Sequence, residues 1–289
     1  MRQENIYLDK KVVELYGLSR IIPDTILREY CAQIVSQTSP KSLCDIGFGK
    51  GSTLIPFSEY LDIDVYGIDS SEEMSKAVYG ELSRRELKAT IITGDAHLLP
   101  SFLNPLDLIH TKAVTHIPSN PFNFLSCISE SVKNNGYLVI GREDSQPEDN
   151  LENIGKYGLN NSEDPILKEF YRTYFQMREE DGKPFIRPDM PAGDYDNAVK
   201  YLIEKGFVFE TEISTPFWNK EITLNEIIES IRNGTFTVFR QGCTPRDMEQ
   251  HAELMKNYCL NNEYSLHETR SYPARLKATI LKKSGELKQ

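Results

Sequence analysis

The chain has 289 residues, 39% of them hydrophobic and 26% charged, which is the composition of a globular protein with room for one elaborate domain or two small ones. Its net charge of −10 argues against a nucleic-acid partner, because a phosphate backbone selects a basic face. No apolar run is long enough to span a membrane and the N-terminus lacks the apolar core of a signal peptide, so we expect a cytoplasmic protein without a membrane partner.

The cysteines and histidines predict neither disulfides nor a metal site. The chain has five cysteines, an odd number without a C-x-x-C spacing, so we expect them to be reduced and mostly buried. None of the five histidines forms a pair with the spacing of metal ligands. We therefore expect no protein-bound metal, and nothing in the composition fixes the oligomeric state.

Residues 1–40 predict an N-terminal helical cap. Apolar side chains recur at helical spacing through residues 7–38, and Pro23 breaks the pattern between two helices. Because these helices precede the first strand, we expect them to lie across the mouth of the fold that follows.

Residues 41–144 alternate short β-rich runs with helical runs. Such alternation predicts βαβ units and a parallel sheet, in which ligands bind beyond the carboxyl ends of the strands. We expect strands near 42–46, 64–68, 89–93, 106–110 and 136–141, and helices near 51–60, 71–86 and 121–133.

A glycine-rich stretch, Lys41–Leu54, joins the first predicted strand to the first predicted helix. Glycine accepts unusual backbone angles and lets a ligand approach the backbone closely. A helix that begins there would also direct unpaired N–H groups at that ligand. The alternative is a strand-to-helix loop without a ligand. The glycines are Gly47, Gly49 and Gly51.

Asp45 ends the first predicted strand, just before these glycines. A carboxylate would repel a diphosphate, so Asp45 favours a ligand with cationic or hydroxyl groups. The pattern D-x-G-x-G-x-G resembles motif I of the class I S-adenosylmethionine-dependent methyltransferases. A nicotinamide fingerprint, G-x-G-x-x-G, would need glycine where this chain has Ser52. The resemblance implies that Asp45 and the three glycines bind S-adenosylmethionine.

Asp69 ends the second predicted strand, D-V-Y-G-I-D-S-S, and Ser71 is expected to cap the next helix. A carboxylate at this position can accept hydrogen bonds from two ribose hydroxyls, or it can cap the helix itself. The run D-x-S-x-x-M resembles the methyltransferase family, in which the acid holds the ribose and the methionine packs on the adenine. The resemblance implies cofactor contacts at Asp69, Ser70 and Met74.

The third predicted strand ends in T-G-D-A-H. Asp95 can accept a hydrogen bond from an exocyclic amino group, and a backbone N–H at Ala96 or its neighbour can meet a ring nitrogen. The alternative is a loop aspartate in an Asx-turn. As the third match in chain order, this run resembles the adenine-binding G-D-A element of the family, which implies that Asp95 and Ala96 contact the cofactor.

The fourth predicted strand leads into T-K-A-V-T-H-I-P, Thr111–Pro118. This run resembles the family segment that lines the gap between the sulfonium and the substrate, and it implies a cofactor contact at Thr111. A neutral imidazole at His116 can accept a proton from a substrate hydroxyl or amine, so His116 is our candidate catalytic residue. The alternative is a structural histidine. Lys112 either meets a substrate carboxylate or is a solvated loop charge.

The rest of the chain predicts structure around that core. A helical lid is expected over residues 145–193, with a helix near 163–180. We expect its row of aromatic side chains to be buried in the core and, as a second role, to line the substrate site. Residues 194–289 predict the last part of the sheet and a helical insertion at about 214–262. We expect a helix over 194–205, a strand over 207–213, helices near 223–233 and 245–259, and a last strand over 274–283.

The insertion carries aromatic and basic side chains for which ordinary burial or surface exposure is the alternative to a substrate contact. They are Trp218, Phe236, Phe239 and Arg240.

These observations predict a Rossmann-like α/β fold, with a seven-stranded, mostly parallel sheet, an antiparallel last strand and a helical cap. The resemblance implies methyl transfer from S-adenosylmethionine, with S-adenosylhomocysteine as product. A small-molecule acceptor is favoured, since no N-P-P-Y-like motif follows the fourth strand. One alternative is a relative that binds the adenosyl cofactor without methylating and has a regulatory or scaffold role. A nicotinamide-dependent oxidoreductase is disfavoured by Ser52 and the G-D-A element.

Overall fold

The computed structural model describes residues 21–115, 117–118, 120–144, 164–184, 195–235 and 237–285. The first of the two predicted N-terminal helices, the candidate catalytic residue His116 and most of the loop before the lid helix therefore lie outside the described residues. Phe236 also lies outside them.

An eight-stranded sheet forms the centre of the molecule, in the order β3-β2-β1-β4-β5-β8-β6, with β7 paired to β8. The first five strands are parallel, whereas β8 runs antiparallel to β5, β6 and β7. This confirms the predicted mostly parallel sheet with an antiparallel last strand. The strands are β1 (Ser42–Ile46), β2 (Asp64–Asp69), β3 (Thr90–Thr93), β4 (Leu106–Lys112), β5 (Val132–Asp144), β6 (Phe207–Ser214), β7 (Trp218–Ile222) and β8 (Arg270–Lys283).

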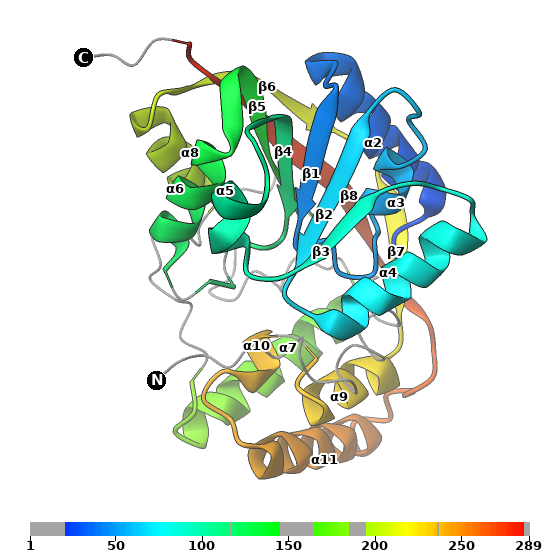
Figure 1. The fold of residues 1–289 in the computed structure, drawn as a ribbon. Coiled ribbons are helices and arrows are strands. Elements are labelled where there is room, and N and C mark those ends of the chain that lie inside the picture. Colours follow the sequence, from blue (N-terminus) through cyan, green and yellow to red (C-terminus); the bar gives the residue numbers. More distant parts are fainter. Residues whose placement is uncertain are drawn as a thin grey trace.

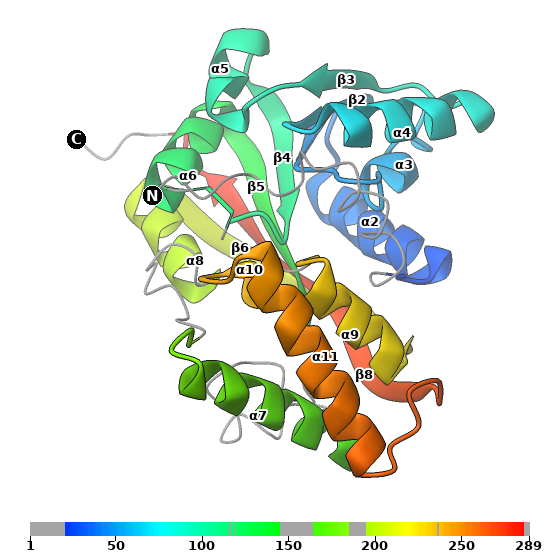
Figure 2. The ribbon, with the colours of Figure 1, turned by 90° about the horizontal axis from the view of Figure 1, so that it is seen from below.

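Helices cover both faces of the sheet. Figures 1 and 2 show α2, α3 and α4 on one face and α5, α6 and α8 on the other. Each face has its own apolar core, because a parallel strand buries side chains on both sides. These helices are α2 (Asp24–Thr38), α3 (Leu54–Phe57), α4 (Glu72–Arg84), α5 (Leu99–Phe102), α6 (Pro121–Glu130) and α8 (Tyr195–Glu204), with a short 3₁₀ turn, η2, at Ala96–Leu98.

A helical lobe of four helices lies on the side of the sheet where the parallel strands end, below the strands in Figure 1. It consists of α7 (Pro165–Glu180), α9 (Leu224–Arg232), α10 (Thr237–Arg240) and α11 (Pro245–Asn261). The lobe has a third apolar core, which includes Phe170 and Tyr174 of α7 and Ile228 of α9. It is thus held together by its own packing, and the chain enters it after β5 and again after β7.

Local sequence signals set the ends of the lobe helices. Thr223 and Glu226 form a capping box at the start of α9, and Thr244 and Asp247 form another at the start of α11. In each box the threonine oxygen accepts a backbone N–H from inside the helix, and the acidic side chain accepts the N–H of the threonine. The predicted helices near 223–233 and 245–259 are therefore confirmed.

Four predictions about individual elements need correction. The helix expected over 51–60 is only Leu54–Phe57, because Gly51 has a φ of 81° and a left-handed residue cannot belong to a right-handed helix. The strand β7 was not predicted, and it makes eight strands of the expected seven. The helix expected over 121–133 ends at Glu130, and β5 begins already at Val132.

The fourth correction concerns α2, which packs on a face of the sheet and not across its mouth. Its buried side chains Leu27, Tyr30 and Ile34 belong to the same core as Leu43 of β1. The apolar stripe that predicted the helix is the surface that attaches it to the sheet.

Candidate active site

The strand register brings the predicted cofactor residues to one edge of the sheet. Ile46 at the end of β1 is paired with Ile68 of β2 on one side and Thr111 of β4 on the other. Asp69 at the end of β2 is paired with Thr93 of β3. The glycine loop, Asp69, the T-G-D-A-H turn and Thr111 therefore all follow neighbouring parallel strands. We call this set the carboxyl rim.

The three glycines of the loop all have left-handed backbone angles, with φ of 65° at Gly47, 56° at Gly49 and 81° at Gly51. A side chain would also clash with the protein at two of them. A Cβ at Gly47 would lie 2.5 Å from Cγ2 of Val114, and a Cβ at Gly51 would lie 2.9 Å from Cδ1 of Ile55. The fold alone thus requires glycine at these two positions, independently of any ligand.

Asp69 holds the middle of this loop. Its Oδ2 accepts the backbone N–H of Gly49 at 2.9 Å, and its Oδ1 accepts the N–H of Ser71 at 2.9 Å. Ser71 in turn caps α4 by accepting the N–H of Met74. The cap of α4 is therefore Ser71 and not Asp69, and each carboxylate oxygen of Asp69 keeps a second lone pair for a hydroxyl donor.

The pKa of Asp69 is raised above its ordinary value of 3.8. Burial is the main cause, and the nearby charge of Asp45 adds to it, while the N–H groups of Ser71 and Gly49 oppose it. A carboxylate in this state gains from further hydrogen-bond donors, which stabilise its ionised form.

Asp45 points into the protein interior, and only 1% of it is exposed. Its Oδ2 accepts the hydroxyl of Thr53 at 2.8 Å, and its Oδ1 lies 2.7 Å from Nδ1 of His110. Nε2 of His110 lies 3.0 Å from the hydroxyl of Tyr30, a residue of α2. The predicted cofactor residue Asp45 thus anchors a buried chain of four polar side chains directly beneath the glycine loop.

The proton positions in this chain follow from its partners. An imidazole that donates from Nδ1 to the carboxylate presents an unprotonated Nε2, which accepts the proton of the Tyr30 hydroxyl. Burial raises the pKa of Tyr30 well above its ordinary value of 10.0, so the hydroxyl keeps that proton. Every polar group in this row of four hydrogen-bonded side chains then has a partner, as buried polar groups require.

Sequence reasoning missed Tyr30, Thr53 and His110. A histidine in a strand that is covered on both faces needs a buried partner, and His110 stands opposite Asp45 in the sheet register. This was the signal available for His110. The partner Tyr30 lies on a helix outside the motif, and only the fold brings it there.

Asp95 adopts the turn that we considered as the alternative. Its Oδ1 accepts the backbone N–H of His97 at 3.0 Å and lies 2.7 Å from the ring Nδ1 of the same histidine. Burial tends to raise the pKa of Asp95, but the two hydrogen bonds from His97 outweigh it and leave the pKa below its ordinary value. The side chain is 63% exposed, so its remaining lone pairs face outward.

The other predicted cofactor residues differ in their exposure. Met74 is 2% exposed and belongs to the core on the α4 side, where it packs as an ordinary apolar residue. Thr111 is fully buried, and its hydroxyl has no hydrogen-bond partner among the described residues. Ser70 is exposed and Ala96 is partly exposed.

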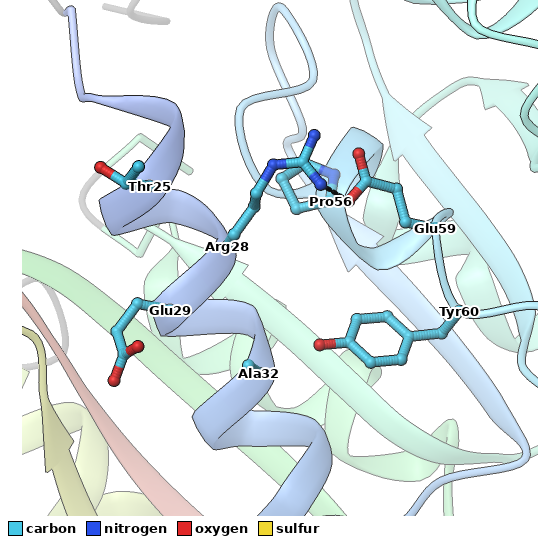
Figure 3. Close-up of a pocket in the computed structure, with 7 residues that line it drawn as sticks. All are labelled: Thr25, Arg28, Glu29, Ala32, Pro56, Glu59 and Tyr60. Atoms are coloured by element: carbon cyan, nitrogen blue, oxygen red, sulfur yellow. Dashed lines mark hydrogen bonds and ion pairs between the residues drawn. The ribbon is translucent and has the colours of Figure 1, made fainter.

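A cavity of about 420 Å³ lies between α2 and α3, away from the residues of the carboxyl rim. Figure 3 shows Arg28 of α2 reaching across it to form an ion pair with Glu59. None of the predicted cofactor residues contributes to its wall, so we do not assign it to the cofactor. It is lined by Thr25, Arg28, Glu29, Ala32, Pro56, Glu59 and Tyr60.

The described residues contain neither a metal-binding cluster nor a membrane-spanning helix. Within the described ranges no group of three or more histidine, cysteine or acidic side chains is arranged to hold a metal ion. No helix in this part of the chain is long and apolar enough to cross a membrane. All five cysteines are free, and Cys31, Cys44 and Cys259 are buried.

Comparisons with known proteins identify one domain of the chain and its fold. Residues 43–136, from β1 into β5, match the family model described as a methyltransferase domain. No curated protein sequence matches the chain.

Three solved structures show the same fold. A candidate methyltransferase from Bacillus halodurans C-125 is 16% identical with a TM-score of 0.52, and the match covers 89% of this chain and 98% of that one. The YcgJ protein of Bacillus subtilis is 15% identical, with a TM-score of 0.50 and coverage of 89% and 98%. The [4+2]-cyclase SpnF is 13% identical, with a TM-score of 0.50 and coverage of 90% and 81%.

The strand order and the solved structures define a Rossmann-like α/β fold. Within that fold, residues 43–136 match a methyltransferase domain.

Proposed function

We propose that the carboxyl rim binds S-adenosylmethionine and that its methyl group is transferred to a small-molecule acceptor held between the rim and the helical lobe. The observation that carries the proposal is the carboxylate of Asp69, which the loop and the α4 N-terminus orient at the end of β2. Its free lone pairs suit a ribose, whose two neighbouring hydroxyls are both donors.

The residues of the rim fit the cofactor in different ways. Asp69 would accept from the ribose, and the exposed Asp95 would accept from the adenine amino group. The buried hydroxyl of Thr111 has no partner in the described part of the chain and would gain one from a bound group. The glycine loop would border the cofactor with its backbone.

Asp45 and Met74 fit less directly. The oxygens of Asp45 already bond Thr53 and His110, and Met74 is part of the core. We assign both a supporting role, in which Asp45 fixes the loop from below and Met74 backs the α4 side of the site.

When bound, the cofactor supplies an electrophilic methyl group on a cationic sulfonium. The contribution of the chain is to hold that group and the acceptor in line and to exclude water from the space between them. The aligned strand ends fix one side of this arrangement and the helical lobe covers the other. The negative charges of Asp45 and Asp69 also favour a cationic ligand at this edge.

His116 remains our candidate for proton removal from the acceptor. It follows β4 by four residues, in the segment that the family resemblance places between sulfonium and substrate. A neutral imidazole would accept a proton from a hydroxyl or amine acceptor at physiological pH.

Two properties support a small-molecule acceptor. The net charge of −10 disfavours binding to nucleic acid, and the helical lobe lies on the side of the sheet where the parallel strands end, which is the side where ligands bind in such sheets. The atom that is methylated, O, N or C, is set by the chemistry of that acceptor.

A second candidate function is cofactor binding without methylation. The structural likeness to a [4+2]-cyclase favours retaining it, because the same fold there carries a different chemistry. In this case the bound adenosyl compound would have a structural or regulatory role. The nicotinamide alternative receives no support from the fold neighbours named above.

The test is methyl transfer from S-adenosylmethionine with a labelled methyl group to fractions of a cell extract. We expect label in the small-molecule fraction, and label confined to protein or nucleic acid would contradict the acceptor class. Stabilisation by S-adenosylhomocysteine without transfer to any fraction would support the second candidate. Stabilisation by NAD and not by S-adenosylhomocysteine would overturn both.

A further inference from the structure

A cysteine, a histidine and an aspartate meet in the helical lobe, outside the carboxyl rim. Sγ of Cys243 lies 3.9 Å from Nδ1 of His251, and Nε2 of His251 lies 3.0 Å from Oδ2 of Asp181. Cys243 immediately precedes the cap of α11, His251 is on that helix, and Asp181 follows the last residue of α7. The three side chains come from two separate parts of the chain.

The aspartate sets the proton positions of the imidazole. Hydrogen bonds from Lys183 and His251 lower the pKa of Asp181, so its carboxylate is ionised and accepts from Nε2–H. The neutral imidazole then has its lone pair on Nδ1, the nitrogen that faces the thiol. His251 is therefore oriented as a base toward Cys243, and only 1% of its surface is exposed.

Neighbouring groups hold this pair in place. The N–H of Cys243 donates to the carbonyl of Arg240 at 3.0 Å. The ring of Tyr174 packs edge-on against His251, with centroids 6.3 Å apart. The Tyr174 hydroxyl is fully buried and interacts with Arg178 as well as with Cys243.

We propose that Cys243 is a reactive thiol with His251 as its base, and that it is a site of reversible mixed-disulfide formation with a small-molecule disulfide. In the forward step the thiol proton moves to Nδ1 of His251 while the sulfur attacks one sulfur of the disulfide. The new S–S bond forms as the old one breaks, and the departing thiolate takes the proton back from His251. No other co-reactant is needed.

The charged groups around the thiol define how its reactivity depends on pH. Burial raises the pKa of Cys243, and the carboxylates of Asp247 and Asp181 also raise it, whereas Arg178 and Lys183 lower it. The thiol is therefore mostly protonated at neutral pH, and its reactivity depends on the imidazole. The rate of modification should therefore depend on His251, which takes up the thiol proton as the sulfur attacks.

The chain provides its own control in Cys127. Both Cys127 and Cys243 are half-buried free cysteines whose pKa burial raises. Among the hydrogen bonds of the described residues, one joins Cys243 to a histidine, and none joins Cys127 to a histidine. A difference in their reactivity therefore reports on His251 more than on exposure. The three buried cysteines report on unfolding, because they react only if the core opens.

The experiment uses the reduced full-length chain with oxidised glutathione, and iodoacetamide in parallel, with each cysteine quantified by peptide mass spectrometry. At pH 7.5 we expect Cys243 to be modified about tenfold faster than Cys127, or more. His251→Asn should bring the two rates together and move the pH dependence of Cys243 to that of a thiol. Asp181→Asn should give an intermediate rate.

Equal rates at Cys243 and Cys127 in the unmodified chain would overturn the proposal, whether or not the variants fold. An unchanged Cys243 rate in His251→Asn, with the buried cysteines still protected, would also overturn it. Alkylation without a glutathione adduct would refute the mixed disulfide.

Discussion

The carboxyl rim and the helical lobe are held in place by different forces. At the rim, two carboxylates turn toward the protein: Asp69 holds the loop backbone and Asp45 holds a buried histidine and threonine. In the lobe most of the interior is an apolar core, which Arg178 and His251 interrupt as buried polar side chains, and further polar side chains cap the helices. The position of the rim thus depends on a few directional contacts, whereas that of the lobe depends on packing.

The largest effect should come from opening the lobe core. Phe170 is fully buried, and Phe170→Ala should reduce the stability of the lobe by about 3–5 kcal/mol, because it removes a large apolar side chain and leaves a cavity. Hydrogen exchange should then increase in α7, α9 and α11 and stay unchanged in β1 and β4. Phe209→Ala is the matched control, since Phe209 is 52% exposed and should change stability by less than about 0.5 kcal/mol. Equal loss of protection in the sheet would show that the two regions are one cooperative unit.

A somewhat smaller effect is expected beneath the rim. Asp45→Ala should lower the free energy of unfolding by about 3 kcal/mol, because it leaves His110 and Thr53 buried without their partner. Denaturant titration measures this change. The exposed Asp64 of β2 provides the control Asp64→Ala, for which we expect less than about 0.5 kcal/mol. Similar values for the two variants would mean that the buried chain contributes nothing.

Removing the hydroxyl at the end of the same hydrogen-bonded row should reduce the free energy of unfolding by less. Tyr30→Phe deletes one hydroxyl and leaves Nε2 of His110 without its donor, so we expect a loss of about 1 kcal/mol. Tyr79→Phe is the control on the surface, since Tyr79 is 67% exposed. Thermal unfolding of the two variants side by side is sufficient to detect the difference, and an unaltered Tyr30→Phe protein would contradict the hydrogen bond.

The smallest effect concerns pH at the rim. The ribose hydroxyls would bind the ionised form of Asp69, so bound cofactor should lower the pKa that burial has raised. Affinity should then be constant above that pKa and fall, by at most about tenfold per pH unit, as the pH drops through it. Calorimetric titrations with S-adenosylhomocysteine at descending pH measure this slope. A slope that persists unchanged in Asp69→Ala would assign it to another group.

The sequence predicted the parts of each region that local residues determine, and it missed the contacts between residues that are distant in the sequence. Strand–turn–helix motifs are local, so Asp69, Ser71 and the glycine loop were placed correctly from neighbouring residues. The partners of Asp45 were not, because His110 is 65 positions away from it and Tyr30 lies 80 positions from His110. Three lobe helices, α7, α9 and α11, were predicted by their periodicity. The helix α10 and the strand β7 were missed because only four residues, Thr237–Arg240, and five residues, Trp218–Ile222, carry their patterns. The assembly of Cys243, His251 and Asp181 leaves no local signal at all.

The central claim is that the carboxyl rim binds an adenosyl cofactor through Asp69. Calorimetric titration of S-adenosylhomocysteine into the unmodified protein, Asp69→Ala and Asp64→Ala tests it most directly. We predict binding to the unmodified protein and to Asp64→Ala with equal affinity, and a loss of more than about 1.5 kcal/mol, roughly tenfold or more in Kd, in Asp69→Ala. Equal affinity in all three proteins, or no binding to the unmodified one, would contradict the claim.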